Sequence, residues 1–339
     1  MLQELFRIPG LDLPIYSYGL MMVIGFLAGI QLAKYLAKRS GLDPELFVNA
    51  GLIALVMGIL GARLSHVLEN FGQYTTITPT RSAWDNFVDA INIRSGGLTY
   101  YGGFLLAFPS LVLYAIKKKV PLRLGMDIVA PCLVIGLGFG RIGCFLNGCC
   151  YGDRCEAQWA GTVQFPYASL AYEDEFYRGN LTNVPMQLLV PAKDGSVRLI
   201  SRDEFQRGYY FDSITSLRTP ITPEQRQLAA GQHSESLLPA QLYSAFTAFL
   251  IAAIALTFFT LPHAPGRGFA LMLMLEGSTR YVLELLRVEP AVIGVFSLSM
   301  IIGAGVAALG VLLWFVFGHL APREPQSGRS PRQPQLQPA

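Results

Sequence analysis

The sequence predicts an all-α integral membrane protein with about seven transmembrane helices and a small extracytoplasmic head. Of its 339 residues, 52% are hydrophobic and only 14% are charged, whereas charged residues make up about a quarter of an average soluble domain. The mean hydropathy is +0.40. Seven segments approach the roughly 20 mostly apolar residues that a helix needs to cross a bilayer. The composition excludes disordered, collagen-like and disulfide-scaffold proteins, and a net charge of +3 is too small to indicate nucleic-acid binding.

The predicted spans follow one another along most of the chain. In order, they are Tyr18–Leu36, Leu46–His66, Tyr100–Ile116, Met126–Cys149, Pro239–Thr260, Gly268–Leu286 and Gly294–His319. The first span has basic residues after it rather than before it, so we expect no cleaved signal peptide.

Basic residues in the connecting loops predict the orientation, because Lys and Arg are retained on the cytoplasmic side. They follow the first span, separate the third from the fourth, precede the sixth and follow the seventh. With seven spans, all four places lie on one side. We therefore expect the N-terminus outside and the C-terminus in the cytoplasm.

The segment 153–237 is the predicted extracytoplasmic head, inserted in a polytopic membrane domain of residues 1–320. It holds 19 of the 49 charged residues and contains β-prone stretches at Val163–Tyr167 and Val197–Ser201. The tail 321–339, with five Pro and four Gln, is predicted to be a disordered cytoplasmic tail.

The sixth predicted span carries charges that are costly inside a membrane and therefore typical of function. Glu276, Arg280, Glu284 and Arg287 fall within an arc of about 80° at 100° per residue, so they share one helix face. A self-neutralising ladder packed on a neighbouring helix is the plain interpretation of this span alone.

Polar residues on the other spans favour a functional interpretation. Arg141 lies about 22 Å above the inner end of its helix, at 1.5 Å per residue. Arg63 and His66 reach a similar height, although a lone histidine near a helix end is usually structural. The outer ends of further spans contribute Tyr18, Tyr100, Tyr101, Gln241 and Tyr243. Arginines inside a span need anionic partners, and a phosphate suits the planar guanidinium. Polar residues at a similar depth on several spans form a polar layer. This polar layer predicts a phospholipid headgroup site facing the outer leaflet.

Four cysteines, Cys144, Cys149, Cys150 and Cys155, fall within 12 residues near the predicted outer face. A metal site, a disulfide involving Cys155 and simple packing as small apolar fillers are all open. Packing is favoured because the spacing matches no standard zinc pattern. We accordingly expect no metal and no cofactor.

Five stretches in register resemble the prolipoprotein diacylglyceryl transferase family. The run Gly140-Arg-Ile-Gly-Cys-Phe-Leu-Asn-Gly-Cys-Cys-Tyr-Gly152 resembles the family signature G-R-x-G-N-F-x-N-x-E-x-x-G. The other four are Tyr16-Ser-Tyr-Gly-Leu20, Gly96-Gly-Leu-Thr-Tyr-Tyr-Gly-Gly103, Pro239-Ala-Gln-Leu-Tyr243 and Arg280-Tyr-Val-Leu-Glu284. The sequence departs from the family where Cys144 replaces Asn, Cys149 replaces Glu, and Tyr101 and Leu238 replace His.

The resemblance implies a bacterial inner-membrane enzyme with its active site toward the outer leaflet. Such an enzyme moves the diacylglyceryl group of phosphatidylglycerol onto the lipobox cysteine of preprolipoprotein signal peptides. It releases glycerol phosphate. The resemblance therefore implies two kinds of partner, membrane lipid and these signal peptides.

The candidate site residues follow from the motifs and from the polar layer. We predict catalytic roles for Arg141 and Arg280, which would hold the phosphate, and for Glu284, which would orient Arg280. Tyr101 is predicted to position a substrate rather than to act as a base, because a neutral phenol is a weak base near neutral pH. The predicted substrate-binding residues are Tyr18, Arg63, Gly102, Gly103, Arg141, Asn147, Gly152, Gln241 and Tyr243.

Two other classes of protein remain open. Buried charges are equally natural in a polytopic lipid transporter or lipid-binding membrane protein, although the sequence has no visible inverted repeat. A redox or metal protein built on the cysteines is the third alternative.

Overall fold

The computed structural model describes residues 4–8, 13–75, 82–92, 97, 99–155, 161–181, 183–192, 195–212, 217–287, 291–294 and 296–320. The predicted tail 321–339 and part of the loop between the second and third predicted spans lie outside the described residues.

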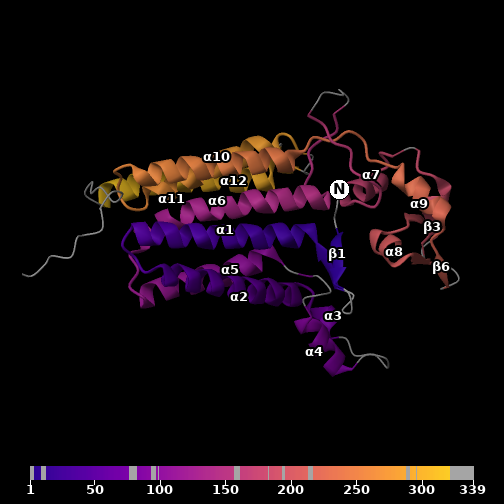
Figure 1. Ribbon diagram of the computed structural model, residues 1–339, viewed down its shortest axis with the longest axis horizontal. Helices are drawn as coiled ribbons and strands as arrows, with labels where there is room; N and C mark the ends of the chain where they lie inside the picture. The colour runs from indigo at the N-terminus through magenta and orange to yellow at the C-terminus, as the bar shows by residue number, and fades with distance from the viewer. Residues whose placement is uncertain are drawn as a thin grey trace, which may run out of the picture. The chain divides into compact units, whose positions relative to one another are not determined.

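A long helix occupies each of the seven predicted spans (Figure 1). They are α1 (Ser17–Arg39), α2 (Pro44–Glu69), α5 (Tyr100–Lys117), α6 (Leu122–Asn147), α10 (Ala240–Thr260), α11 (Arg267–Glu284) and α12 (Leu298–Leu320). Five of them, α1, α2, α6, α10 and α12, are long and apolar enough to cross a membrane. Helix α5 is shorter, and α11 carries the charges at positions 276, 280 and 284. The protein is therefore a mainly helical membrane protein.

Some predicted helix ends are wrong for local reasons. Helix α6 ends at Asn147 rather than at Cys149, because Gly148 adopts φ +75°, the left-handed conformation with which helices often end. Gly294 is not helical but lies in the turn of a hairpin between β7 (Ala291–Ile293) and β8 (Phe296–Ser297), so α12 begins at Leu298. A further hairpin, β1 (Glu4–Ile8) with β2 (Leu13–Tyr16), precedes α1 and was not predicted.

The chain divides into two compact units whose boundaries run through several helices. The first unit comprises Met1–Leu27, Leu133–Ile254 and Leu271–Leu312, and the second unit comprises Ala28–Cys132, Ala255–Ala270 and Leu313–Ala339.

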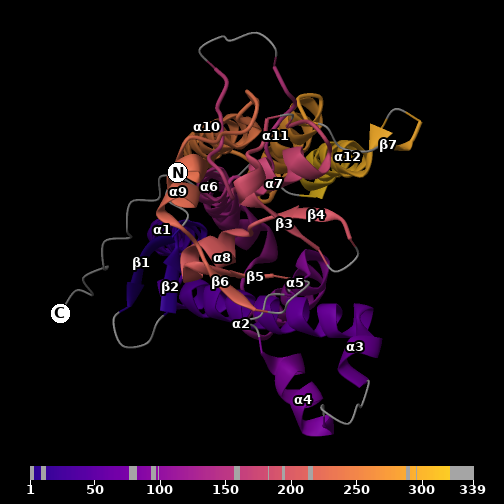
Figure 2. The same ribbon diagram turned by 90° about the vertical axis from the view of Figure 1, so that its right-hand side faces the viewer.

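In the second unit, α2 and α5 lie side by side (Figures 1 and 2). Glycines make this close approach possible. A Cβ on Gly61 would lie 2.4 Å from the carbonyl oxygen of Gly102, and one on Gly103 would lie 2.9 Å from that of Gly58. The short helices α3 (Phe71–Thr75) and α4 (Ala83–Ile91) follow α2.

A buried carboxylate holds the start of α11 in the second unit. Asp127 of α6 accepts hydrogen bonds from the backbone N–H groups of Gly266, at 2.6 Å, and Phe269, at 2.9 Å. His263 Nε2 lies 3.4 Å from the same carboxylate. The carboxylate thus satisfies N–H groups that a helix start leaves unpaired.

In the first unit, small residues bring further helix pairs together. Gly25 of α1 packs against Phe139 and Gly136 of α6, and Gly138 packs against Phe249 of α10. Gly277 of α11 faces Gly303 and Ala307 of α12, where a Cβ would lie 2.5 Å from a backbone nitrogen. Close packing of small residues is the usual way for helices to associate in a membrane.

The predicted head folds as a set of short elements within the first unit (Figure 2). They are α7 (Leu170–Tyr177), η2 (Met186–Leu188), β3 (Leu189–Pro191), β4 (Val197–Leu199), α8 (Arg202–Arg207), β5 (Tyr209–Phe211), β6 (Arg218–Pro220) and α9 (Pro223–Ala230). β3 pairs with β4, and β5 pairs with β6. The predicted strand at Val197 is confirmed, whereas Val163 and Pro166 form only isolated bridges.

Candidate active site

A polar pocket lies among α6, α10, α11 and α12, entirely within the first unit. We call it the arginine pocket. Its lining residues are Arg141, Cys150, Ala240, Ser244, Thr247, Glu276, Thr279, Arg280, Leu283, Glu284, Arg287 and Ser299.

Arg141 and Arg280 bring incompletely satisfied cations to this pocket from two helices. The Nε atom of each guanidinium is buried and has no hydrogen-bond partner among the described residues. A buried donor of this kind carries a desolvation cost of about 1–3 kcal/mol until something accepts its hydrogen bond. The two side chains therefore suit an anion that enters the pocket.

Glu284 is buried in the pocket wall with partners different from those predicted. Its Oε1 accepts a hydrogen bond from the Ser297 hydroxyl at 3.1 Å, and its Oε2 lies 3.6 Å from Arg287 NH1. Glu284 therefore pairs with Ser297 and Arg287, and the prediction that it orients Arg280 is wrong. The helix ends at Glu284, and the turn that follows brings Arg287 back to the carboxylate.

The four charges predicted to share one face of the sixth span all line the pocket. Glu276 adds a carboxylate beside the two arginines. The hydroxyl groups of Ser244, Thr247, Thr279 and Ser299 also line the pocket and were not predicted as site residues. The i,i+3 spacing of Ser244 and Thr247 on α10 was the available signal.

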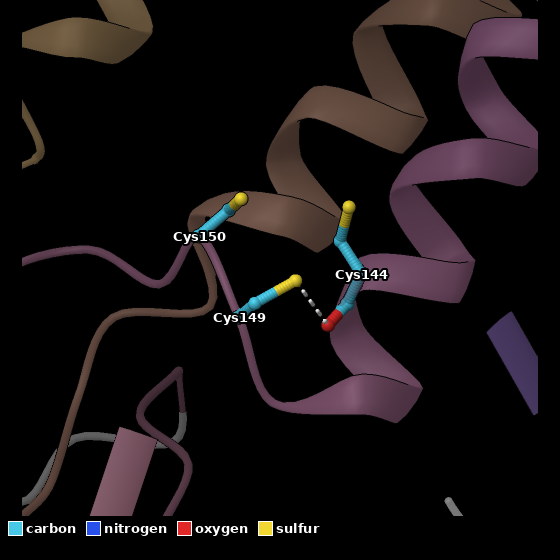
Figure 3. A group of neighbouring side chains, drawn as sticks. All are labelled: Cys144, Cys149 and Cys150. Carbon is cyan, nitrogen blue, oxygen red and sulfur yellow. Dashed lines mark hydrogen bonds between the residues drawn. The ribbon is translucent and has the colours of Figure 1, made fainter. Parts of the chain in front are cut away.

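Cysteines border the pocket where the chain leaves α6. Cys144 lies in the last turns of α6, and Cys149 and Cys150 follow it (Figure 3). The five cysteines, all among the described residues, form no disulfide with one another, so the disulfide considered for Cys155 is not present. The sulfur atoms of Cys144, Cys149 and Cys150 lie within 4.8 Å of one another. We call these three residues the cysteine cluster.

Four further predicted site residues lie at or near this segment. The fully buried Gln241 donates from Nε2 to the carbonyl oxygen of Cys149 at 2.8 Å. A Cβ on Gly152 would lie 2.7 Å from the Leu286 carbonyl oxygen, so only glycine fits there. Asn147 Oδ1 lies 3.4 Å from Arg202 NH1 of the head. Tyr243 donates to the Gly161 carbonyl oxygen at 3.4 Å.

Tyr18 of α1 also belongs to the first unit but does not line the pocket. Its side chain is partly exposed, and a Cβ on Gly143 of α6 would lie 3.0 Å from the ring. Gly143 therefore lets α6 approach the N-terminal end of α1 at Tyr18.

Four predicted site residues, Arg63, Tyr101, Gly102 and Gly103, belong to the second unit. Arg63 is buried and donates to the carbonyl oxygens of Asp89 at 2.5 Å, Ala90 at 2.9 Å and Gly97 at 2.9 Å. The structure thus uses this guanidinium to hold the segment after α2, in place of the predicted substrate contact.

The other three residues lie in the first turn of α5. Gly102 and Gly103 pack directly against α2, which explains both glycines without a ligand. Tyr101 is 58% exposed. His66 lies 3.4 Å from the amide nitrogen of Asn70 and packs edge-on against Tyr74, as expected of a structural histidine.

The fold and the pocket together define a helical membrane protein with an arginine-lined polar pocket. Comparison with known proteins gives the family. The family model described as "Prolipoprotein diacylglyceryl transferase" matches residues 3–316, and the chain belongs to this family.

Several curated relatives are named phosphatidylglycerol–prolipoprotein diacylglyceryl transferase. Their sequence similarity to this chain extends over about half of it or over most of it. The protein of Rhodopirellula baltica is 32% identical over 170 residues, which are 50% of this chain and 33% of that protein. The protein of Corynebacterium diphtheriae is 31% identical over 152 residues, or 45% of this chain and 52% of that protein. The chain thus spans a third to about half of these two relatives. It is 26% identical to the Clostridium tetani protein over 314 residues, covering 92% and 95% of the two chains.

Proposed function

We propose that this protein transfers the diacylglyceryl group of phosphatidylglycerol to the thiol of the lipobox cysteine of preprolipoproteins. The reaction is the first step of bacterial lipoprotein maturation. The observation that carries the proposal is the arginine pocket, in which Arg141 and Arg280 each present a buried, unpartnered Nε–H. The family of the chain and the names of its relatives supply the substrate class.

The reaction is a displacement at the glyceryl carbon that carries the phosphate. The incoming thiolate sulfur forms a bond to this carbon as the bond between the carbon and its phosphate oxygen breaks. The electron pair remains on the departing glycerol phosphate, which therefore gains one negative charge. The thiol proton leaves to a base whose identity we do not assign.

The pocket suits this charge development. Glu284 and Arg287 lie 3.6 Å apart and largely neutralise each other. Arg141, Arg280 and Glu276 remain, and the pocket has a formal charge of +1. Charged donors already in place stabilise a leaving group most when its charge increases in the transition state. Arg141 and Arg280 are therefore the proposed catalytic residues, and Glu284 positions Arg287.

The other candidate residues have proposed binding roles. Tyr18, Asn147, Gly152, Gln241 and Tyr243 shape the border between the helices and the head. The exposed Tyr101 positions a substrate, with Gly102 and Gly103 permitting the approach of its helix to α2.

The proposed topology has seven spans in the bacterial inner membrane, with the N-terminus outside. Residues 1–320 then form the membrane domain, 153–237 the extracytoplasmic head and 321–339 a disordered cytoplasmic tail. Basic residues at the inner ends of the helices support this orientation. The pocket opens toward the outer leaflet, where phosphatidylglycerol and the signal peptide meet.

The proposal is tested by replacing each arginine of the pocket in purified protein. Arg141→Gln and Arg280→Gln are expected to reduce thioether formation on a lipobox peptide by about 10²–10³-fold, as loss of a transition-state donor typically does. The readout is transfer of labelled diacylglyceryl groups from phosphatidylglycerol to the peptide.

Arg39→Gln is the matched control, because Arg39 is exposed at the end of α1. Its rate should equal that of the parent protein. Unchanged rates in folded Arg141→Gln and Arg280→Gln variants would refute the mechanism. Protein that binds labelled phosphatidylglycerol without ever lipidating the peptide would instead be a transporter or lipid-binding protein.

A further inference from the structure

The three thiols of the cysteine cluster lie close together, although Cys144 is on α6 and Cys149 and Cys150 follow the end of that helix. Gly148 has φ +75° and Cys150 has φ +61°, so the chain turns back sharply after α6. Cys149 donates from its backbone nitrogen to the Cys144 carbonyl oxygen at 3.1 Å. The Cys149 thiol also points toward that oxygen, at 3.7 Å (Figure 3). The turn thereby brings two thiols back to the one on the helix.

Neighbouring residues hold this turn in place. Gln241 donates to the Cys149 carbonyl oxygen, and Gly152 donates its backbone N–H to the Leu238 carbonyl oxygen at 2.8 Å. Both contacts are short, and Gln241 is fully buried. The three thiols are therefore preorganised, which reduces the entropy cost of gathering them around a ligand.

The cluster differs from cysteines that only fill space. Cys132 of α6 packs against a hydrophobic core and donates its thiol to the Ile128 carbonyl oxygen at 3.2 Å. The three clustered thiols are half-buried as Cys132 is, but they lie against one another, and Cys150 lines the arginine pocket. Simple packing, which the sequence favours, describes Cys132 better than the cluster.

The spacing of the sulfur atoms suits a metal ion. At a metal–sulfur distance of about 2.3 Å, thiolates around one tetrahedral ion lie roughly 3.8 Å apart. The observed sulfurs lie within 4.8 Å of one another, so rotations of the side chains can close the difference. A disulfide needs about 2.05 Å and would join only two of the three.

We propose that Cys144, Cys149 and Cys150 together bind one thiophilic metal ion, of the Zn²⁺ or Cu⁺ class, as three thiolates. Soft sulfur ligands select such ions. Each thiol that coordinates the ion releases its proton to water. Because Cys150 lines the arginine pocket, the ion lies at the border of that pocket. The net negative charge of the site then lies beside the arginines.

Cadmium is the probe for this site, since cadmium thiolates absorb in the ultraviolet by sulfur-to-metal charge transfer. The fully reduced, full-length protein in detergent micelles is titrated with Cd²⁺. We expect the absorbance to saturate at one ion per chain. Cys144→Ser, Cys149→Ser and Cys150→Ser should each weaken binding at least tenfold.

Cys155→Ser and Cys132→Ala are the matched controls, and they should bind as the parent protein does. Addition of Zn²⁺ or Cu⁺ should displace the cadmium, and the more effective ion identifies the class. Binding that survives Cys149→Ser, or stoichiometric cadmium that neither ion displaces, would overturn the proposal.

A protection experiment avoids the risk that a variant fails to fold. With Cd²⁺ bound to the parent protein, alkylation followed by mass spectrometry should find Cys144, Cys149 and Cys150 protected and Cys155 still reactive. Equal reactivity of the three thiols with and without Cd²⁺ contradicts the site. Neither readout measures lipid transfer, so the outcome is independent of the proposed transferase activity.

Discussion

At the scale of single residues, three arginines divide into two kinds by their hydrogen-bond partners. Arg63 donates to three backbone carbonyl oxygens. The Nε atoms of Arg141 and Arg280 have no partner among the described residues. The first kind stabilises the fold. The second kind lowers stability and leaves a donor for the anion of the proposed substrate, as functional sites often do.

This difference predicts opposite effects on stability. Arg63→Ala should destabilise the protein by about 1–3 kcal/mol, because it leaves buried carbonyl oxygens without donors. Arg141→Met should leave the stability unchanged or raise it, because it removes a buried Nε–H that has no hydrogen-bond partner among the described residues. Thermal unfolding in lipid-free detergent micelles measures both. An Arg141→Met variant that unfolds earlier than Arg63→Ala would contradict the distinction.

Gly152 offers a second test at the residue scale. Gly152→Ala should destabilise the segment after α6 by about 1–3 kcal/mol, since the new Cβ would lie 2.7 Å from the Leu286 carbonyl oxygen and 2.9 Å from Leu238. It should also reduce lipid transfer by displacing Cys150 in the pocket wall. Gly136→Ala is the control, because nothing lies within 4 Å of its added Cβ. Equal stability of the two variants would show that the close approach at Gly152 is not required.

At the scale of elements, α8 of the head is held by one carboxylate. Glu204 accepts a bidentate pair of hydrogen bonds from Arg198, at 2.7 and 2.8 Å, and further bonds from Ser201 and the Phe211 backbone. Burial by itself would raise the pKa of Glu204, but these hydrogen bonds outweigh it and lower the pKa to about 2. The carboxylate thus connects the start of α8 to β4 and β5.

The lowered pKa predicts how the stability of the head depends on pH. The folded state favours the ionised carboxylate, so this contribution is complete above the ordinary carboxyl pKa of 4.5 and is lost as the pH falls toward 2. Limited proteolysis of the intact protein over this range should show the head becoming susceptible on acidification. Glu204→Gln should be more susceptible at neutral pH and less dependent on pH. A parallel pH profile for the two proteins would remove Glu204 as the cause.

At the scale of the whole molecule, the proposed topology predicts which residues are reachable from each side of the membrane. A cysteine introduced by Val197→Cys in the exposed edge of β4 should react with a membrane-impermeant thiol reagent in intact spheroplasts. Lys118→Cys, at the end of α5, should react only after permeabilisation. Both variants are made in a Cys155→Ser background to reduce labelling of native thiols. Labelling of position 118 from outside would reverse the orientation.

The sequence by itself determined the membrane character, the seven helices to within a few residues and the shared face of the α11 charges. These properties depend on composition and local periodicity, and both can be derived from consecutive residues of the sequence. The family motifs could likewise be recognised in the sequence, because they are short runs of neighbouring residues.

The tertiary structure alone decided which partner each polar group has. Glu284 pairs with Arg287 and Ser297 rather than Arg280, and Arg63 holds backbone carbonyls. Three cysteines meet because of a turn at Gly148 and Cys150. Contacts of this kind depend on where the backbone turns and on what other helices bring alongside. Spacing within one helix carries no information about either.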